Sequence, residues 1–249
     1  PAVYDMLSRM KAKLDAGRSL LYQTARFVDI YKALEDIARD RKLAPEERQE
    51  MKKYSRLADA FTPLAKGMNS EYANQNAYDA ISIHGGSGFI MEYKSQRLYR
   101  DARIFSIYEG TTQLQVVAAI RYISNGTYLN IIKEMLAEEV SEELKPLKVR
   151  VEKMVELYEQ SLNYVKEADN IEMHDFLGRR LYDMTADIIM SLLILADATT
   201  APELFQKSAN VYVRHAEEEV IGHSAYVKNF IAEDLVNFRA AEEKAETEE

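Results

Sequence analysis

Hydrophobic residues near the start of the chain recur at helical spacing. Val3, Met6, Leu7, Met10 and Leu14 follow the three-, four- and seven-residue spacing of one apolar helix face. The pattern is already present at the third residue. The chain is therefore expected to open inside a helix rather than in a loop.

The second predicted helix spans about residues 45–83. A polar stretch over residues 39–44 separates it from the first helix. Pro45 is followed by two glutamates, and proline at a helix start with acids in the first turn fits both the geometry and the dipole of a helix N-terminus. The glycines within residues 85–88 predict its end, because glycine commonly terminates helices.

The remainder of the chain is also helical in pattern, with no convincing strand, so we predict an all-α fold. A helix that resumes after Thr111 ends at Asn125-Gly126, which is the expected boundary between two domains. The first, residues 1–125, is expected to be an up-and-down helical bundle, and the second, residues 126–249, an additional helical domain. Further helices are predicted over residues 127–144, 146–168, 173–198 and 202–240. The last residues, 240–249, lack apolar periodicity and are expected to fray into solvent.

Composition restricts the class of protein. Apolar residues make up 47% of the 249 positions and charged residues 29%, which is ordinary for a soluble globular protein. The net charge of −9 argues against nucleic acid as the main partner. The longest apolar stretch, residues 188–196, is about half as long as a membrane span and predicts a buried helix. The chain has no cysteine and shows no secretion leader, which is compatible with a cytoplasmic protein.

The sharpest chemical signal is the sequence Ile-Tyr-Glu-Gly-Thr-Thr-Gln-Leu-Gln at residues 107–115, where helical sequence breaks off and then resumes. The carboxylate of Glu109 is a natural base for removing a proton next to a carbonyl, and an apolar pocket would strengthen it. Tyr108 and the preceding isoleucine could form the walls of such a pocket. Gly110 allows close approach of a ligand, and Thr111 fits the N-cap of the next helix. On these residues alone, a capping turn with a solvated acid is the simpler interpretation.

A longer ordered pattern surrounds this motif and favours a catalytic role for Glu109 over a simple capping turn. Residues 79–121 contain a polar residue, two spacers, Gly-Gly-x-Gly and a hydrophobe, followed by an acid, a base and an acid at set distances. These places are filled by Ser82, Gly85, Gly86, Gly88, Phe89, Glu92, Arg97 and Asp101. The pattern resembles the C-terminal helical domain of flavin-dependent acyl-CoA dehydrogenases, and the resemblance covers roughly the first half of the chain.

The resemblance implies a role for each matching position. Glu109 matches the glutamate that removes the α-proton of an acyl-CoA thioester, while the β-hydrogen leaves as hydride to the flavin and a trans-2-enoyl-CoA forms. The backbone amide of this base also helps to hold the thioester carbonyl in the family. Tyr108 and Gly110 match residues on the substrate side. Positions that contact the FAD of a neighbouring subunit are matched by Ser82, Gly85, Gly86, Thr111 and Gln113.

The family also implies partners and missing parts. Its members pass electrons to an electron-transfer flavoprotein, act in fatty acid β-oxidation and form homodimers or homotetramers. They often have glutamine where this chain has Ser82, and some place the catalytic acid on another helix. They also carry an N-terminal helical domain and a middle β-domain that are not seen here, so the chain alone is expected to bind FAD weakly or not at all and to be inactive. Residues 126–249 resemble the extra domain of larger bacterial members, with a dimer contact or a lid as the hypothesis.

Two other polar groups offer alternative sites. His215, Glu219 and His223 share one helix face and could contribute to a metal site, although a solvated or ion-paired face is the favoured interpretation. The charged segment 100–103 could steer a phosphate-bearing cofactor, but structural ion pairs are the better interpretation. A second hypothesis for the whole chain remains a non-catalytic helical oligomerisation or interaction module that retains the family fold.

Overall fold

The computed structural model describes residues 1–239, and within that range every regular element is helical and none is a strand. The helices are α1 (Ala2–Asp40), α2 (Pro45–His84), α3 (Gly86–Phe89), α4 (Ser95–Ala102), α5 (Thr112–Ser124), α6 (Thr127–Leu136), α7 (Lys145–Glu167), α8 (Ile171–Thr200), α9 (Pro202–Asn229) and α10 (Val236–Arg239). Three 3-10 helices lie between them: η1 (Arg103–Ser106), η2 (Glu142–Leu144) and η3 (Ala232–Leu235). The predicted all-α fold is confirmed.

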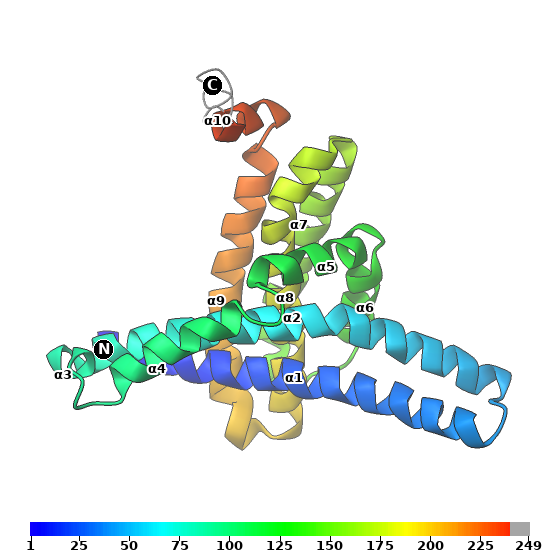
Figure 1. Cartoon of the computed structure of the whole chain (residues 1–249), viewed down its shortest axis with the longest axis horizontal. Helices are drawn as coiled ribbons and strands as arrows, with labels where there is room; N and C mark the ends of the chain where they lie inside the picture. Colours follow the sequence, from blue (N-terminus) through cyan, green and yellow to red (C-terminus); the bar gives the residue numbers. More distant parts are fainter. Residues whose placement is uncertain (240–249) are drawn as a thin grey trace.

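Helices α1 and α2 form a long antiparallel hairpin, with the two helices side by side along its length (Figure 1). The predicted break between them is confirmed, because α1 ends at Asp40 and α2 begins at Pro45. Glu47 fixes this turn by accepting hydrogen bonds from the Ala44 amide at 2.8 Å and from the Arg41 guanidinium at 2.6 Å. A carboxylate that satisfies a free amide in the first helical turn is the expected stabilising arrangement.

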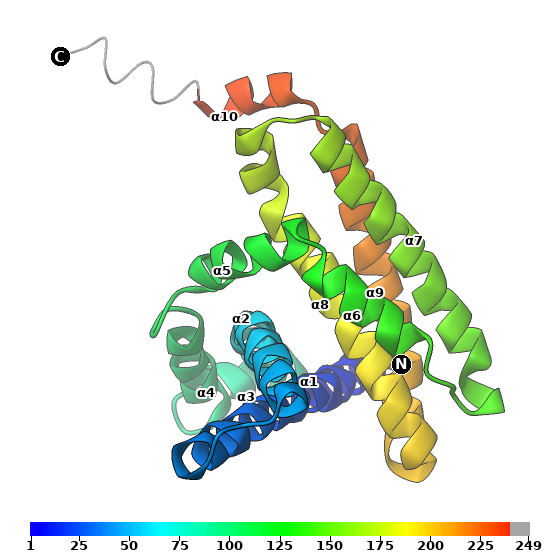
Figure 2. The same cartoon turned by 90° about the vertical axis from the view of Figure 1, so that its right-hand side faces the viewer.

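Helices α7, α8 and α9 form a second layer that runs across the α1–α2 hairpin, while α5 and α6 connect the two layers (Figures 1 and 2). The apolar stretch 188–196 lies in α8, where all but its last residue are buried, so the predicted buried helix is confirmed. One continuous hydrophobic core joins the layers, with Phe61 and Leu64 of α2 and Ile189 of α8 all fully buried in it. Among the described helices, none is both long enough and apolar enough to cross a membrane.

Two glycines allow α8 to lie close to α2 and to α5. At Gly67 of α2, an added Cβ would lie 2.1 Å from Oη of Tyr182, and at Gly178 of α8 it would lie 2.6 Å from Cδ1 of Ile120. The Tyr182 hydroxyl donates a hydrogen bond of 2.9 Å to the carbonyl of Pro63. Helix α8 is therefore fixed against the part of α2 that lies just before the residues supporting the Glu109 segment.

Two predicted helices are wrong at their C-terminal ends. The helix predicted over residues 127–144 ends at Leu136, where two glutamates follow and would meet the negative end of the helix dipole. The helix predicted over residues 202–240 ends at Asn229 because Phe230 adopts an extended conformation. There the Phe230 carbonyl accepts a hydrogen bond from Tyr164 Oη at 2.8 Å, a tertiary contact that no local pattern reveals. The predicted fraying of residues 240–249 lies outside the described residues.

Candidate active site

Glu109 occupies a left-handed turn between η1 and α5. Its φ angle is 50°, and Gly110 follows with a φ angle of 91°. Left-handed backbone is uncommon for a residue with a side chain and costs on the order of 1 kcal/mol or more. Such a conformation persists only where the surroundings hold it, which makes this turn a defined feature rather than a loose loop.

The turn is held from both α5 and α2. Thr111 is the N-cap of α5 and accepts a hydrogen bond from the Leu114 amide at 3.3 Å, so its predicted capping role is confirmed. The next residue, Thr112, is buried and donates a hydrogen bond of 2.5 Å to Oε1 of Glu71 on α2. The Gly110 carbonyl accepts a hydrogen bond of 2.6 Å from Lys66, also on α2. These contacts place the Glu109 turn directly beside the long helix.

The side chains around the carboxylate are open to solvent. Glu109 is exposed, and Tyr108 and Ile107 keep 47% and 45% of their surface. Within the described residues, Tyr108 and Ile107 therefore do not enclose the acid in an apolar pocket. Gln113, predicted to contact the cofactor, is exposed one turn further along.

The glycine-rich turn forms a second cluster of predicted residues. Helix α2 ends at His84, and Gly85 has a φ angle of 58°, as expected for a glycine that terminates a helix. Added Cβ atoms at Gly85 and Gly86 would meet nothing within 4 Å, and Ser82 is exposed. The backbone here is open to a ligand. Figure 1 shows this turn beside α3 at one end of α4, whereas the Glu109 turn follows the other end.

The predicted site residues therefore fall into two groups rather than one cleft. Ser82, Gly85 and Gly86 lie before α4, and the residues at positions 108–113 lie after it. Along α2, Ser82 lies 16 residues beyond Lys66, whose side chain binds the Gly110 carbonyl, which corresponds to a separation of about 24 Å along the helix axis. A ligand that contacted both groups would have to be extended along α4.

The charged segment between the two groups does not form the predicted ion pairs. Within residues 1–239, no ion pair involves Arg100, Asp101 or Arg103. Arg103 instead donates a hydrogen bond to Oγ of Ser106 within η1. The prediction was wrong: Arg100 and Asp101 on α4 and Arg103 on η1 all have exposed side chains.

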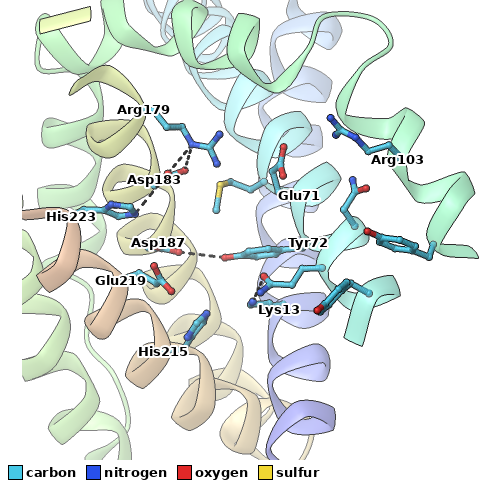
Figure 3. A pocket seen from close by; sticks show the side chains of 15 residues that line it. Lys13, Glu71, Tyr72, Arg103, Arg179, Asp183, Asp187, His215, Glu219 and His223 are labelled. Atoms are coloured by element: carbon cyan, nitrogen blue, oxygen red, sulfur yellow. Dashed lines mark hydrogen bonds and ion pairs between the residues drawn. The ribbon is translucent and has the colours of Figure 1, made fainter. Parts of the chain in front are cut away.

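A polar cavity of about 500 Å³ lies where α8 and α9 cross α1 and α2 (Figure 3). Arg179 and Asp183 of α8 form an ion pair at 2.8 Å on its wall. Glu71 reaches the same cavity from α2, so the residue that binds Thr112 also faces the second layer. Its lining comes from five distant segments, so sequence patterns found only the helix face that carries His215, Glu219 and His223.

Asp187 is the most unusual ionisable group in this cavity. Its side chain accepts hydrogen bonds from Tyr212 Oη at 3.1 Å and from Tyr72 Oη at 3.4 Å, and only 6% of the residue is exposed. Burial, reinforced by the negative charge of Asp183, raises the pKa of Asp187 to about 8. The one available signal in the sequence was an aspartate directly before a continuous apolar run.

The face that carries His215, Glu219 and His223 borders this cavity (Figure 3). Burial lowers the pKa of both histidines below its usual value, which favours their neutral forms. His223 Nε2 lies 3.7 Å from a carboxylate oxygen of Asp183. Within the described part of the chain, no group of three histidine, aspartate or glutamate side chains has an arrangement that could hold a metal ion.

Each half of the chain matches a family model of acyl-CoA dehydrogenases. A family model described as the C-terminal domain of acyl-CoA dehydrogenase matches residues 1–122. A second, described as acyl-CoA dehydrogenase C terminal, matches residues 124–235. The two models together account for nearly the whole described chain.

Individual relatives match a smaller part. The 3-methylmercaptopropionyl-CoA dehydrogenase of Ruegeria pomeroyi is 40% identical over 115 residues, which is 46% of this chain and 18% of that protein. The caffeyl-CoA reductase-Etf complex subunit CarC of Acetobacterium woodii is 36% identical over 114 residues, 46% of this chain and 24% of the other. The chain thus spans about a quarter or less of the length of these relatives.

A solved structure has a similar fold over most of the chain. The acyl-CoA dehydrogenase of Bacillus anthracis, whose crystal structure is a complex with FAD, aligns with a TM-score of 0.66. The alignment covers 90% of this chain and 41% of that protein at 21% identity. At this identity the likeness establishes that the arrangement of helices is shared.

Proposed function

Because the chain belongs to the acyl-CoA dehydrogenase family, we propose that it provides the catalytic base of an FAD-dependent oxidoreductase. The reaction is the α,β-dehydrogenation of an acyl-CoA thioester to a trans-2-enoyl-CoA. Glu109 accepts the α-proton as the Cα–H bond breaks, and the electron pair of that bond forms the new double bond. Bound FAD supplies the acceptor for the hydride that leaves the β-carbon.

The observation that carries this proposal is the fixed, accessible Glu109 turn. The left-handed backbone presents the carboxylate to solvent next to Tyr108 and Gly110, which we assign to the substrate side. Within residues 1–239, the backbone amides of Glu109 and Gly110 make no hydrogen bond. They are free to donate to the thioester carbonyl, and such donation stabilises the negative charge that develops when the α-proton is removed.

The residues predicted to contact FAD fit an extended cofactor. Gly85 and Gly86 leave an uncovered backbone, and Ser82 next to them has an exposed hydroxyl. Thr111 and Gln113 provide polar groups at the other end of α4. We assign these five residues to cofactor binding, with the shorter reach of serine, compared with the glutamine common in the family, making Ser82 the weakest contact.

The exposure of both groups supports the further proposal that this chain alone is inactive. The described residues leave Gly85, Gly86 and Glu109 in solvent, so nothing within residues 1–239 encloses a flavin or excludes water from the base. We expect the purified chain to contain no FAD and to show no dehydrogenase activity. Flavin absorbance at one equivalent per chain would contradict this expectation.

Substitution Glu109→Gln tests the catalytic assignment in the assembled flavoprotein that contains this chain. The amide keeps the shape of the side chain but cannot accept the α-proton, so exchange of that proton with deuterated water should be abolished while flavin remains bound. Exchange is measured by mass spectrometry on a bound acyl-CoA analogue. Glu50→Gln, at an exposed glutamate of α2, is the matched control. Retained exchange in Glu109→Gln would exclude Glu109 as the base.

The remaining assignments follow from the family. We propose an electron-transfer flavoprotein as the electron acceptor, supported by a relative that is named as a subunit of an Etf complex. A homodimer or homotetramer, a cytoplasmic location and a role in fatty acid β-oxidation are proposed on the same basis. The two family matches meet between residues 122 and 124, which supports a domain boundary near Asn125-Gly126.

A second function, a non-catalytic helical interaction module, is favoured by one observation. Helix α1 exposes a series of large apolar side chains that another protein surface would cover. They are Val3, Tyr4, Leu7, Leu14, Leu21 and Tyr22. The Glu109→Gln experiment separates the two functions, since an interaction module would assemble normally and show no exchange even with Glu109 intact.

A further inference from the structure

The backbone of the Glu109 turn has few hydrogen bonds of its own. Backbone-to-backbone hydrogen bonding along the chain stops at the Tyr108 amide, which donates to the Ile104 carbonyl at 3.1 Å. It resumes at the Gln115 amide, which donates to the Thr111 carbonyl, also at 3.1 Å. The left-handed residue lies in the gap, so contacts from other elements must hold it.

Lys66 bridges this gap from α2. Its ammonium group donates a hydrogen bond of 2.9 Å to the carbonyl of Phe105, before the turn, and one of 2.6 Å to the carbonyl of Gly110, after it. The same nitrogen lies 5.7 Å from the centre of the Tyr108 ring. A single charged group thus ties together both ends of the segment that carries Glu109.

We call these contacts of Lys66 with the Phe105 and Gly110 carbonyls the clamp, and the part of α2 that carries it is rigid. Lys66 is flanked by buried Ala65 and Gly67, and Gly67 lies directly beneath Tyr182 of α8. Other contacts on the turn are neutral: Ser70 Oγ donates to the Phe105 carbonyl at 2.9 Å, and Gln115 Nε2 donates to the Gly110 carbonyl at 3.3 Å. Hydrogen bonds from an ionised donor are roughly twice as strong as neutral ones, so Lys66 makes the main contribution.

We infer that Lys66 is a positioning residue, which holds the left-handed turn so that Glu109 and its backbone amide face the substrate together. The inference rests on the proposed function only for its catalytic consequence, because the clamp itself is a property of this fold. Displacement of a catalytic group by about 1 Å can lower a rate by about 100-fold. Loss of the clamp should therefore affect the chemical step more than substrate binding.

Three variants test the inference. Lys66→Met keeps the aliphatic stem but removes the charge and every donor, whereas Lys66→Arg keeps both. Lys52→Met removes an exposed lysine of the same helix that lies in a different groove. Thermal unfolding of all three confirms that each is folded before other measurements are compared. If Lys66→Met does not fold, Lys66→Gln, which removes the charge but keeps a neutral donor, takes its place.

The first measurement is hydrogen exchange in this chain, followed by mass spectrometry of peptides covering residues 105–113. In Lys66→Met the amides of Ile107 and Tyr108 should exchange at least tenfold faster, while peptides of α7 and α9 are unchanged. Lys66→Arg should restore most of the protection, and Lys52→Met should resemble the unmodified chain. Unchanged exchange in Lys66→Met would overturn the clamp.

The second measurement is steady-state kinetics in the assembled flavoprotein. We expect kcat to fall about 10- to 100-fold in Lys66→Met with KM changed less than about threefold, and partial recovery in Lys66→Arg. Faster exchange of the turn with an unchanged kcat would refute the positioning role. The proposed function fails separately, through retained α-proton exchange in Glu109→Gln, and that result leaves the hydrogen-exchange evidence for the clamp intact.

Discussion

Asp187→Asn should stabilise the protein at alkaline pH and flatten part of its pH dependence. Asp187 lies in the cavity between the two layers, with Asp183 on its own helix, Glu219 and Tyr212 on α9 and Tyr72 on α2 around it. Lys13 of α1 faces the same cavity and is paired with Gln75 at 2.5 Å. Asparagine keeps an oxygen to accept the two tyrosine hydrogen bonds but removes the charge that burial disfavours.

The direction of this pH dependence follows from the protonation of Asp187 in the folded and the unfolded chain. The pKa of Asp187 is about 8 in the folded protein and 3.8 in its reference state, so between these values the folded chain holds a proton that the unfolded chain has lost. The free energy of unfolding therefore decreases as the pH rises from about 4 to about 8, and it levels off above. The difference between the two pKa values corresponds, at about 1.4 kcal/mol per pKa unit, to a loss of at most about 6 kcal/mol in the free energy of unfolding.

Relaxation and water entry reduce such penalties, so we expect Asp187→Asn to gain about 2–3 kcal/mol relative to the unmodified chain at pH 8.5 and much less at pH 5. For a chain of this size, a gain of that kind raises Tm by about 4–12 °C. The assay is thermal unfolding followed by circular dichroism at half-unit steps from pH 5 to pH 9. Asp175→Asn, at an exposed aspartate of the same helix, is the control.

Comparing variant with parent cancels the opposing contribution of the histidines. The lowered pKa of His223 makes the free energy of unfolding fall as the pH drops through the acid range, and this effect is common to both proteins. A constant difference in Tm between Asp187→Asn and the parent at every pH would refute the reasoning. A variant that is less stable than the parent at pH 8.5 would refute it equally.

Two further predictions concern the backbone. Gly67→Ala should destabilise the chain by about 2–4 kcal/mol, measured by urea titration, because the added Cβ would lie 2.1 Å from Oη of buried Tyr182. Gly222→Ala should stabilise the chain by about 0.5–1 kcal/mol, because the position is inside a helix and the added Cβ would meet nothing within 4 Å. Equal effects of the two alanines would contradict the close approach. Glu109→Gly should raise the free energy of unfolding by about 1 kcal/mol, because glycine adopts a φ angle of 50° without strain, whereas Glu109→Ala should not raise it. If Glu109→Gly is no more stable than Glu109→Ala, the turn carries no strain.

Much of the helical architecture could be predicted locally. Helical spacing, Pro45 with its following acids and Gly85 each act within one or two turns, and the structure places α1, α2 and their ends where these signals put them. The errors occurred at Leu136 and Phe230, where a helix ends early. At Phe230 the decisive contact comes from α7, far away in the sequence.

The candidate site also has features that the local sequence reveals and features that only tertiary contacts decide. Glu109, the glycine turn and the Thr111 cap form a contiguous ordered pattern, so the sequence by itself determined the family, the helical fold and the residue to test as the base. Only the tertiary structure decided that Glu109 is held in a left-handed turn by Lys66, and that Asp187 is buried with a raised pKa. Both depend on helices that cross after long separations in the chain, and the pKa of a carboxyl group or the strain of a turn is set by those neighbours rather than by adjacent residues.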